Sequence, residues 1–477
     1  MTAPHPDLDL VAASGPQRII FDITSTASWF GPPVGIMRVE QELARYARTE
    51  RPDIILAFYR PSIGFRPVTP QFAETVIGSH AIIDPIYFFR LEHLQGIRRW
   101  LPSRYPLLIA LERLRLMTKS AIVSRVADVL QRILLLNRYS HPFINARKKR
   151  VAVISPSFAL GSPLSLGPRD VFVSAGDGWL KTDIEKNADY KNRLGFRWVV
   201  LCYDLIPLTH PEFYSTKDVE AFRQYWTMMF ALADRIIFNS RQIESDAQFY
   251  CERAGIRMAS TAVVPLGHQP RPPSSNQSVP LPPPLEPGRF ALFVSTIEPR
   301  KGHGMLVRVW RRLLADGVPQ RNRFNLVFVG RRGWMVDAVL REIDEMRGEE
   351  AMLQHFADLP DAGLVRLYQD AAFCLYPSIY EGFGLPIVEA FSYGKAVLAS
   401  TGGALPETVA GLSPCLNPVD EDAWYSHLKG WIEDPAAHKP FEEKIRISFC
   451  PATWHDVARR FFAAAVALSP PGRNLPS

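Results

Sequence analysis

Two glutamates eight positions apart frame a glycine-rich turn in the C-terminal third of the chain. Glu381 opens the run Glu-Gly-Phe-Gly-Leu-Pro-Ile-Val-Glu, and Glu389 closes it. Carboxylates accept hydrogen bonds from sugar hydroxyls, and an acidic residue placed in this way can hold the ribose of a nucleotide. The pair therefore indicates one binding position for a sugar and a second one for a ribose.

The turn between the two glutamates has the composition of an anion-binding site. A short apolar run at 373–376 predicts a strand before it. Gly382 and Gly384 allow a tight turn with uncovered backbone N–H groups, and Pro386 suits the first turn of a helix. The positive end of a helix favours a phosphate. A diphosphate position between two sugar positions indicates a nucleotide-sugar site.

The glutamate pair has two alternative interpretations. Glycosidase carboxyl groups stand roughly 5 to 9.5 Å apart, whereas eight helical residues span about 12 Å. The turn at Glu381 leaves that distance open, but the two carboxylates need not converge on one atom. A lone acidic pair would most simply be a solvated cap residue and a helix-surface residue, and the glycine turn between them argues against this.

Two adjacent cations follow a second apolar run, at 290–295. Arg300 and Lys301 lie in the loop after this predicted strand. A guanidinium binds phosphate oxygens in pairs, and an ammonium acts as a point charge. A pair of surface cations is the simpler alternative. In an active site, the two would neutralise the charge that grows on a departing diphosphate.

The first half of the chain offers weaker candidates. A predicted strand at 18–23 and helix at 36–47 enclose a loop that contains Gly35, and a single turn of this kind is weak evidence. A strand at 198–203 ends in Tyr203 and Asp204, and open α/β sheets bind ligands at the carboxyl ends of their strands.

The run at 381–389 resembles the Glu-x7-Glu signature of retaining GT-B glycosyltransferases, in particular the large bacterial family that includes mannosyltransferases of lipopolysaccharide and capsule assembly. Stretches at 295–302, 326–334 and 400–407 are similar to that family in the same order. The resemblance implies an α/β protein with two doubly wound Rossmann-like domains facing a cleft. It implies catalytic roles for Glu381, Arg300 and Lys301, and donor binding by Gly35, Tyr203, Asp204, Gly330, Phe356, Gly382, Phe383, Gly384, Leu385 and Glu389.

The resemblance also implies the chemistry, which is metal-independent hexosyl transfer with retained anomeric configuration and no cofactor. The expected partners are a nucleotide-diphosphate sugar, with GDP-mannose slightly favoured, and a hydroxyl of a saccharide or lipid-linked acceptor in cell-surface polysaccharide assembly. The family usually has a histidine at the position of Tyr203. Two alternatives stay open: a catalytically inert, membrane-associated GT-B binding protein, and a GT-B phosphorylase or epimerase.

Length and composition set the frame for these sites. A chain of 477 residues exceeds what one core usually supports, so two domains are expected. The five cysteines are scattered without Cys-x-x-Cys spacing, which favours a reduced, cytoplasmic protein with no zinc site and no disulfide framework. We expect neither a signal peptide nor a membrane span.

Prolines and serines crowd at 270–288, and such a segment favours extended backbone and indicates a linker. We therefore expect an N-terminal, acceptor-side domain at 1–269 and a nucleotide-sugar-binding domain at 289–452. The resemblance adds that a C-terminal helix at 453–468 returns to the first domain.

A basic segment at about 92–150 accounts for much of the net charge of +7. Between Arg98 and Arg150, thirteen Lys or Arg residues accompany two acids, with apolar residues at helical spacing. This pattern is typical of a helix on an anionic membrane surface, and equally of packed helices with a solvated basic face. No nucleic-acid motif accompanies it, so we expect no nucleic-acid partner. A peripheral position on the inner face of the membrane would suit a lipid-linked acceptor.

Overall fold

The computed structural model describes residues 17–29, 35–60, 63–78, 81–83, 152–154, 156–181, 183–268, 279–346 and 350–468. The chain divides into two compact units, residues 1–200 with 232–234, and residues 201–231 with 235–477. The predicted basic segment at 92–150 lies outside the described residues. Of the predicted linker, residues 279–288 are described, and they form no helix or strand.

The first sheet has seven strands in the order β3-β2-β1-β6-β7-β8-β9. The strands are β1 (Ile19–Asp22), β2 (Ile54–Arg60), β3 (Gly64–Pro67), β6 (Val171–Ser174), β7 (Arg197–Cys202), β8 (Arg235–Phe238) and β9 (Ser260–Val263). β3 runs antiparallel to β2 in a hairpin, whereas β1 pairs in parallel with both β2 and β6. The strands predicted from apolar runs are confirmed, because such runs are typical of strands that are buried on both faces.

One predicted strand lies outside the seven-stranded sheet. The apolar run at 151–155 predicts a strand of the buried type, and β5 (Ala152–Ile154) does form there. It pairs in parallel with β4 (Ala81–Ile83) in a separate two-stranded sheet. An apolar run shows that a segment is a strand but does not say which strand it pairs with.

The helices of this half differ in how their ends are capped. They are α1 (Thr24–Ala27), α2 (Ile36–Glu50), α3 (Pro70–Ile77), α8 (Pro156–Ala159), α9 (Gly178–Lys181), α10 (Ile184–Leu194), α11 (Ile206–Thr209), α12 (Thr216–Leu232) and α13 (Arg241–Ala254), with a 3-10 turn at Pro211–Phe213. Ser240 caps α13 by accepting from the N–H of Ile243, and Gly255 ends it in the left-handed conformation. The helix predicted at 36–47 is confirmed and buries Val39, Leu43 and Ala47.

The second sheet has six parallel strands in the order β12-β11-β10-β13-β14-β15. They are β10 (Phe290–Val294), β11 (Asn325–Val329), β12 (Leu353–Phe356), β13 (Phe373–Tyr376), β14 (Val397–Ser400) and β15 (Cys415–Leu416). Counted from β10, this is the order 3-2-1-4-5-6 of doubly wound folds. The expectation of Rossmann-like sheets is therefore confirmed.

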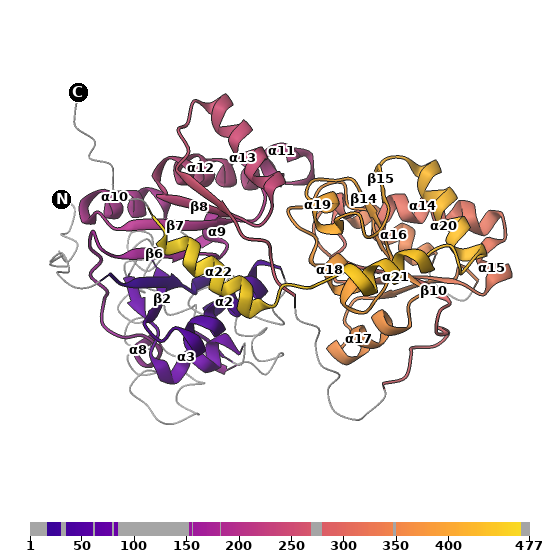
Figure 1. The fold of residues 1–477 in the computed structure, drawn as a ribbon, viewed down its shortest axis with the longest axis horizontal. Coiled ribbons are helices and arrows are strands. Elements are labelled where there is room, and N and C mark those ends of the chain that lie inside the picture. Colours follow the sequence, from indigo (N-terminus) through magenta and orange to yellow (C-terminus); the bar gives the residue numbers. More distant parts are fainter. Residues whose placement is uncertain are drawn as a thin grey trace, which may run out of the picture. The chain divides into compact units, whose positions relative to one another are not determined.

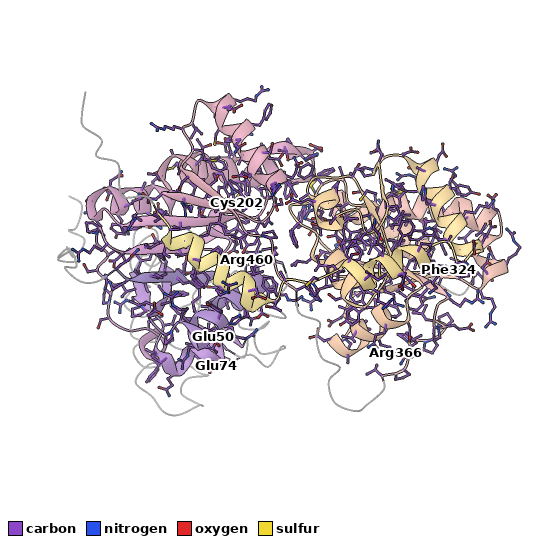
Figure 2. All side chains as sticks on the ribbon, in the orientation of Figure 1. Glu50, Glu74, Cys202, Phe324, Arg366 and Arg460 are labelled. Atoms are coloured by element: carbon purple, nitrogen blue, oxygen red, sulfur yellow. The ribbon has the colours of Figure 1, made fainter. Side chains whose placement is uncertain are left out.

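Helices alternate with these strands along the chain. They are α14 (His303–Ala315), α15 (Val318–Asn322), α16 (Asp337–Glu345), α17 (Asp361–Asp370), α18 (Leu385–Ser392), α19 (Leu405–Val409), α20 (Glu421–Glu433), α21 (Lys439–Ser448) and α22 (Trp454–Val466). Helices α14, α15 and α20 pack together beside the sheet (Figure 1). Phe324, labelled in Figure 2, leads into β11 and stacks on Phe373 with the ring centroids 5.7 Å apart.

The last helix, α22, lies against the first sheet. It buries Trp454, Phe461 and Phe462, and the guanidinium of Arg235, at the start of β8, donates to the carbonyl of Ala464 at 2.6 Å. None of the helices in the described parts of the chain has both the length and the apolar character needed to cross a bilayer.

The order of the second sheet determines where a ligand can bind. β10 and β13 are neighbours, with Leu292 opposite Cys374, and strand order reverses between them. In open α/β sheets, ligands bind in the crevice outside the carboxyl ends of the strands at such a switch point. The loops after β10 and β13, at 295–302 and 377–384, both begin at this crevice.

Candidate active site

Glu381 lies at the centre of the crevice between β10 and β13. It follows β13 in the loop before α18, and only 6% of its surface is exposed. The hydroxyl of Tyr376, the last residue of β13, donates to Oε1 of Glu381 at 3.2 Å. Such a deeply buried carboxylate requires partners of opposite charge.

Arg300 and Lys301 provide those partners from the loop after β10. Nη1 of Arg300 donates to Oε2 of Glu381 at 2.8 Å, and Nζ of Lys301 donates to Oε1 at 2.5 Å. The side chains of all three residues are almost completely buried. The predicted catalytic residues thus come together, although 80 positions of sequence separate the two loops.

Gly302 allows the two loops to come this close. Its φ is +84°, and a β-carbon at this position would lie 2.5 Å from the carbonyl oxygen of Pro377. A side chain would therefore be strained by the backbone conformation and would also collide with the opposite loop. Gly302 directly follows the 3-10 turn Pro299–Lys301 and leads into α14.

The two cations keep Glu381 ionised. Burial alone would raise the pKa of this carboxyl, but Arg300 and then Lys301 oppose it and lower the pKa to about 2. Glu381 is therefore charged at every pH at which the chain is expected to work.

Arg300 has a second carboxylate partner, which the sequence analysis did not identify. Its Nη2 lies 3.3 Å from Oε2 of Glu298, and its Nη1 also donates to the carbonyl of Tyr380 at 2.9 Å. Burial raises the pKa of Glu298. Two carboxylates thus balance two cations in one cluster. The Nε–H of Arg300 is buried without an acceptor among the described residues.

The turn at 382–385 leads directly into α18. Gly384 precedes the helix with φ +101°, and no side chain in the described parts of the chain caps it. Leu385 is the first helical residue, followed by Pro386 as predicted. Pro386 has no N–H, and that of Ile387 donates to the carbonyl of Gly384 at 3.0 Å. The helix start therefore offers an anion the N–H of Leu385 and the positive end of its dipole.

The stretch at 400–408 stabilises this turn through two hydrogen bonds. The carbonyl of Glu381 accepts from the N–H of Ala404 at 2.9 Å, and the carbonyl of Phe383 accepts from Oγ1 of Thr408 at 2.5 Å. The backbone of the turn is thus held at both ends by one segment that follows β14.

Glu389 lies one helical turn inside α18, as predicted. It is half-buried, and its Oε2 accepts from the hydroxyl of Tyr368 at 3.1 Å. Tyr368 lies on α17 and is buried, so this contact fixes the direction of the carboxylate.

Tyr203 and Asp204 meet the turn through the end of β7. A β-carbon on Gly382 would lie 2.0 Å from the carbonyl oxygen of Tyr203 and 3.0 Å from Cβ of Asp204. Tyr203 is buried, and the atom that approaches Gly382 is its main-chain carbonyl oxygen. Burial raises the pKa of Asp204, while the nearby Arg300 acts in the opposite direction.

Gly330 and Phe356 lie together at the ends of β11 and β12. The N–H of Gly330 donates to the carbonyl of Phe356 at 3.0 Å. A cavity of about 690 Å³ opens beside these strand ends, and it is lined by Arg332, Asp337, Leu340, Arg341, Asp344, His355 and Ala357. This volume is within the range of small-molecule sites.

Gly35 belongs to the other unit. It precedes α2 with φ +53°, and its carbonyl accepts from the N–H of Arg38 at 3.1 Å. It therefore forms a glycine-led helix start of the expected kind.

Sequence reasoning missed Glu298 and Tyr376 as members of the cluster. Glu298 lies within the stretch 295–302, two residues before Arg300. This spacing of an acid and a cation was the one feature of the sequence that could have indicated their contact. In the described part of the chain, no three His, Cys, Asp or Glu side chains are grouped so that they could hold a metal ion.

Comparison with known proteins shows what this chain is similar to. Residues 282–447 match the family described as glycosyl transferases group 1. O-antigen chain mannosyltransferase B of Escherichia coli is 37% identical over 145 residues, which are 30% of this chain and 37% of that protein. The serotype-specific mannosyltransferase WbdA of Escherichia coli is 25% identical over 273 residues, 55% of this chain and 32% of that protein. The chain thus spans about a third of the length of these relatives.

A solved structure shows the fold. Anabaena Alr3699/HepE, in complex with UDP and glucose, superposes with a TM-score of 0.52 at 14% identity, covering 94% of this chain and 99% of that one. The two doubly wound sheets and this superposition show a fold of the GT-B type, and residues 282–447 are similar to the glycosyl transferases group 1.

Proposed function

We propose that the protein is a retaining, metal-independent glycosyltransferase that moves a hexose from a nucleotide-diphosphate sugar to a hydroxyl of a saccharide or lipid-linked acceptor. The observation that carries this proposal is the cluster of Arg300, Lys301 and Glu381 at the switch point between β10 and β13. It provides two cations in the crevice where a doubly wound fold binds nucleotides.

The leaving diphosphate is the group that this site is suited to stabilise. Breaking the bond between the anomeric carbon and the diphosphate oxygen places growing negative charge on that oxygen. Arg300, Lys301 and the N–H of Leu385 at the start of α18 are fixed donors for this charge. The unpaired Nε–H of Arg300 is one donor without an acceptor in the described residues, and a phosphate oxygen would supply the acceptor.

The two carboxylates are assigned to the two sugars of the donor. Glu381, beside the cations, would accept from hydroxyls of the transferred hexose, and Glu389, held by Tyr368, would accept from the ribose. The new bond forms on the same face of the hexose from which the diphosphate leaves, and the acceptor proton passes to the departing phosphate oxygen. This front-face course needs no side chain as a nucleophile.

The donor base would occupy the cavity beside Gly330 and Phe356. GDP-mannose is our first choice of donor, because two relatives are named mannosyltransferases and one of these is named for the O-antigen chain. By the same reasoning, a mannose-containing saccharide of the cell surface is the first acceptor to test.

The full chain tests this proposal directly. It would be mixed with GDP-mannose, UDP-glucose, ADP-glucose or dTDP-glucose, with and without mannosyl acceptors, and release of the nucleoside diphosphate would be followed. We expect slow release without acceptor, faster release with acceptor, and an α-linked product by NMR. Release of a sugar phosphate would support the phosphorylase alternative, and tight binding without any turnover would support the inert binding protein.

A further inference from the structure

Both cations that the proposed function assigns to the diphosphate are already bound to one carboxylate. Each oxygen of Glu381 engages one of them, with Oε2 at 2.8 Å from Nη1 of Arg300 and Oε1 at 2.5 Å from Nζ of Lys301. A carboxylate that bridges two cations with two anionic oxygens has the same outward form as one end of a phosphate group.

Burial explains why such a bridge is needed. The side chains of Arg300 and Lys301 are 12% and 11% exposed, and a buried charge without a partner is strongly destabilising. Before a donor binds, these cations need anions, and Glu381 is the carboxylate that contacts both of them.

We infer that Glu381 competes with the donor diphosphate for Arg300 and Lys301, and that donor binding releases its carboxylate toward the transferred hexose. This inference rests on the proposed function and deepens it, because it gives one residue two successive roles. The diphosphate replaces the carboxylate as the partner of the cations, and the freed carboxylate becomes an acceptor for sugar hydroxyls.

The proposed exchange involves the side chain of Glu381 and leaves its backbone in place. Its carbonyl is fixed by the N–H of Ala404 at 2.9 Å, so only side-chain rotation is required. Arg300 would remain oriented by the carbonyl of Tyr380 and by Glu298. The ring of Tyr376 lies 5.9 Å from Nζ of Lys301 and provides a cation–π contact throughout.

The competition is between full charges. Because Arg300 and Lys301 hold the pKa of Glu381 at about 2 against the effect of burial, the carboxylate stays ionised across the physiological range. The Glu381 carboxylate therefore opposes donor binding equally at every pH in this range, because it is not protonated there.

Calorimetric titration of the full chain with GDP tests the inference. Glu381→Gln keeps the size of the side chain and removes its charge, so we expect GDP to bind about tenfold more tightly, which corresponds to roughly 1.4 kcal/mol. Glu298→Gln is the matched control, since it removes the same charge from the other carboxylate beside Arg300. We expect it to change GDP affinity less than threefold.

Two results of this titration would overturn the inference. If Glu381→Gln binds GDP no more tightly than the wild type, there is no competition. If Glu298→Gln strengthens binding as much as Glu381→Gln, net charge explains the effect and direct displacement does not. Circular dichroism and the Tm of each variant establish that it is folded.

A structure of the wild-type chain with GDP decides the matter if Glu381→Gln does not fold. Movement of the carboxylate away from at least one cation supports the inference, and both contacts unchanged at about 3 Å overturn it. Failure of the proposed function would look different. In that case wild type and both variants would bind none of GDP, UDP, ADP and dTDP.

Discussion

The carbonyl oxygen of Pro377 lies 2.5 Å from the point at which a β-carbon on Gly302 would stand. This approach joins the loop that carries Arg300 and Lys301 to the loop that carries Glu381. The ion pairs of the site therefore depend on a contact between two backbones, and no side chain can adjust it.

Replacing Gly302 with alanine should damage both stability and activity. A residue forced to φ +84° and against a carbonyl costs about 1–3 kcal/mol, and the two loops must separate. We expect a lower Tm and a loss of turnover by tenfold or more. Gly394→Ala is the control, because Gly394 has φ +70° but nothing within 4 Å of its β-carbon position. Equal losses of turnover in both variants would show that the approach of the loops does not matter.

Removing the ammonium of Lys301 should abolish most of the turnover. Lys301→Ala deletes one of the two cations that would stabilise the departing diphosphate, and loss of one such donor typically costs a factor of about 10²–10³ in kcat. The exposed Lys444, which donates to the carbonyl of Gly411 at 2.7 Å, serves as control in Lys444→Ala. Steady-state kinetics measure both variants, and a wild-type kcat in Lys301→Ala would remove this residue from the mechanism.

Weakening the support of Glu389 should affect donor binding and spare the chemical step. Tyr368→Phe removes the hydroxyl that donates to Oε2 of Glu389 at 3.1 Å, and a lost hydrogen bond of this kind is worth about 1.5–3 kcal/mol when the acceptor is charged. We expect KM for the donor to rise about tenfold with kcat almost unchanged, because ribose contacts are the same in ground and transition states. Tyr425→Phe on α20 is the control, because it removes a hydroxyl that donates to another carboxylate, that of Asp316. A fall in kcat at constant KM would speak against the ribose assignment.

Stability should fall with acidity through His303. Burial and, next to it, Lys301 lower the pKa of His303 to about 3 from an ordinary value of 6.5. Because the folded-state pKa lies below the unfolded one, the contribution is complete above pH 6.5 and is lost as the pH falls toward 3, by up to about 1.4 kcal/mol per pH unit. The imidazole lies 4.5 Å from the ring of Phe293 and 5.1 Å from that of Phe328, centroid to centroid.

His303→Leu removes this titration and keeps an apolar group of similar size. Calorimetry between pH 7 and 4 should therefore show a flatter decline of Tm than in the wild type. The exposed His427 on α20, changed in His427→Leu, is the comparison. Parallel pH profiles for wild type and His303→Leu would exclude His303 as a cause of acid sensitivity.

Chelation of metal ions should leave the reaction rate unchanged. The positive charge that the proposed reaction needs comes from Arg300, Lys301 and the start of α18. The measurement is the initial rate of nucleoside diphosphate release after dialysis against EDTA, followed by addition of Mg²⁺ or Mn²⁺. A rate that collapses on dialysis and recovers with either ion would contradict metal independence.

Local features of the second sheet were predictable from the sequence. The apolar run at 373–376, the glycines after it and Pro386 each have one dominant conformational preference, and together they define β13, the turn and α18. The α/β class followed equally from the alternation of strands and helices.

The contacts between distant segments were not predictable from local pattern. Glu381 and Lys301 are 80 residues apart, and their meeting depends on β10 lying next to β13, which the sheet order determines. Only the resemblance to a family brought them together beforehand. Glu298 was overlooked because an acid beside cations normally indicates a solvated surface, and its burial follows from tertiary packing alone. The pairing of β5 with β4 could not be predicted for the same reason.

The hydrogen bonds from Ala404 and Thr408 to the carbonyls of Glu381 and Phe383 have a consequence for how the protein meets its donor. The glycine turn is ordered by its own chain, so a ligand does not have to freeze a mobile segment when it arrives. The free energy of association is then not diminished by the entropy of folding a loop. A turn that is ordered in advance would therefore favour tighter binding of the proposed nucleotide-sugar donor.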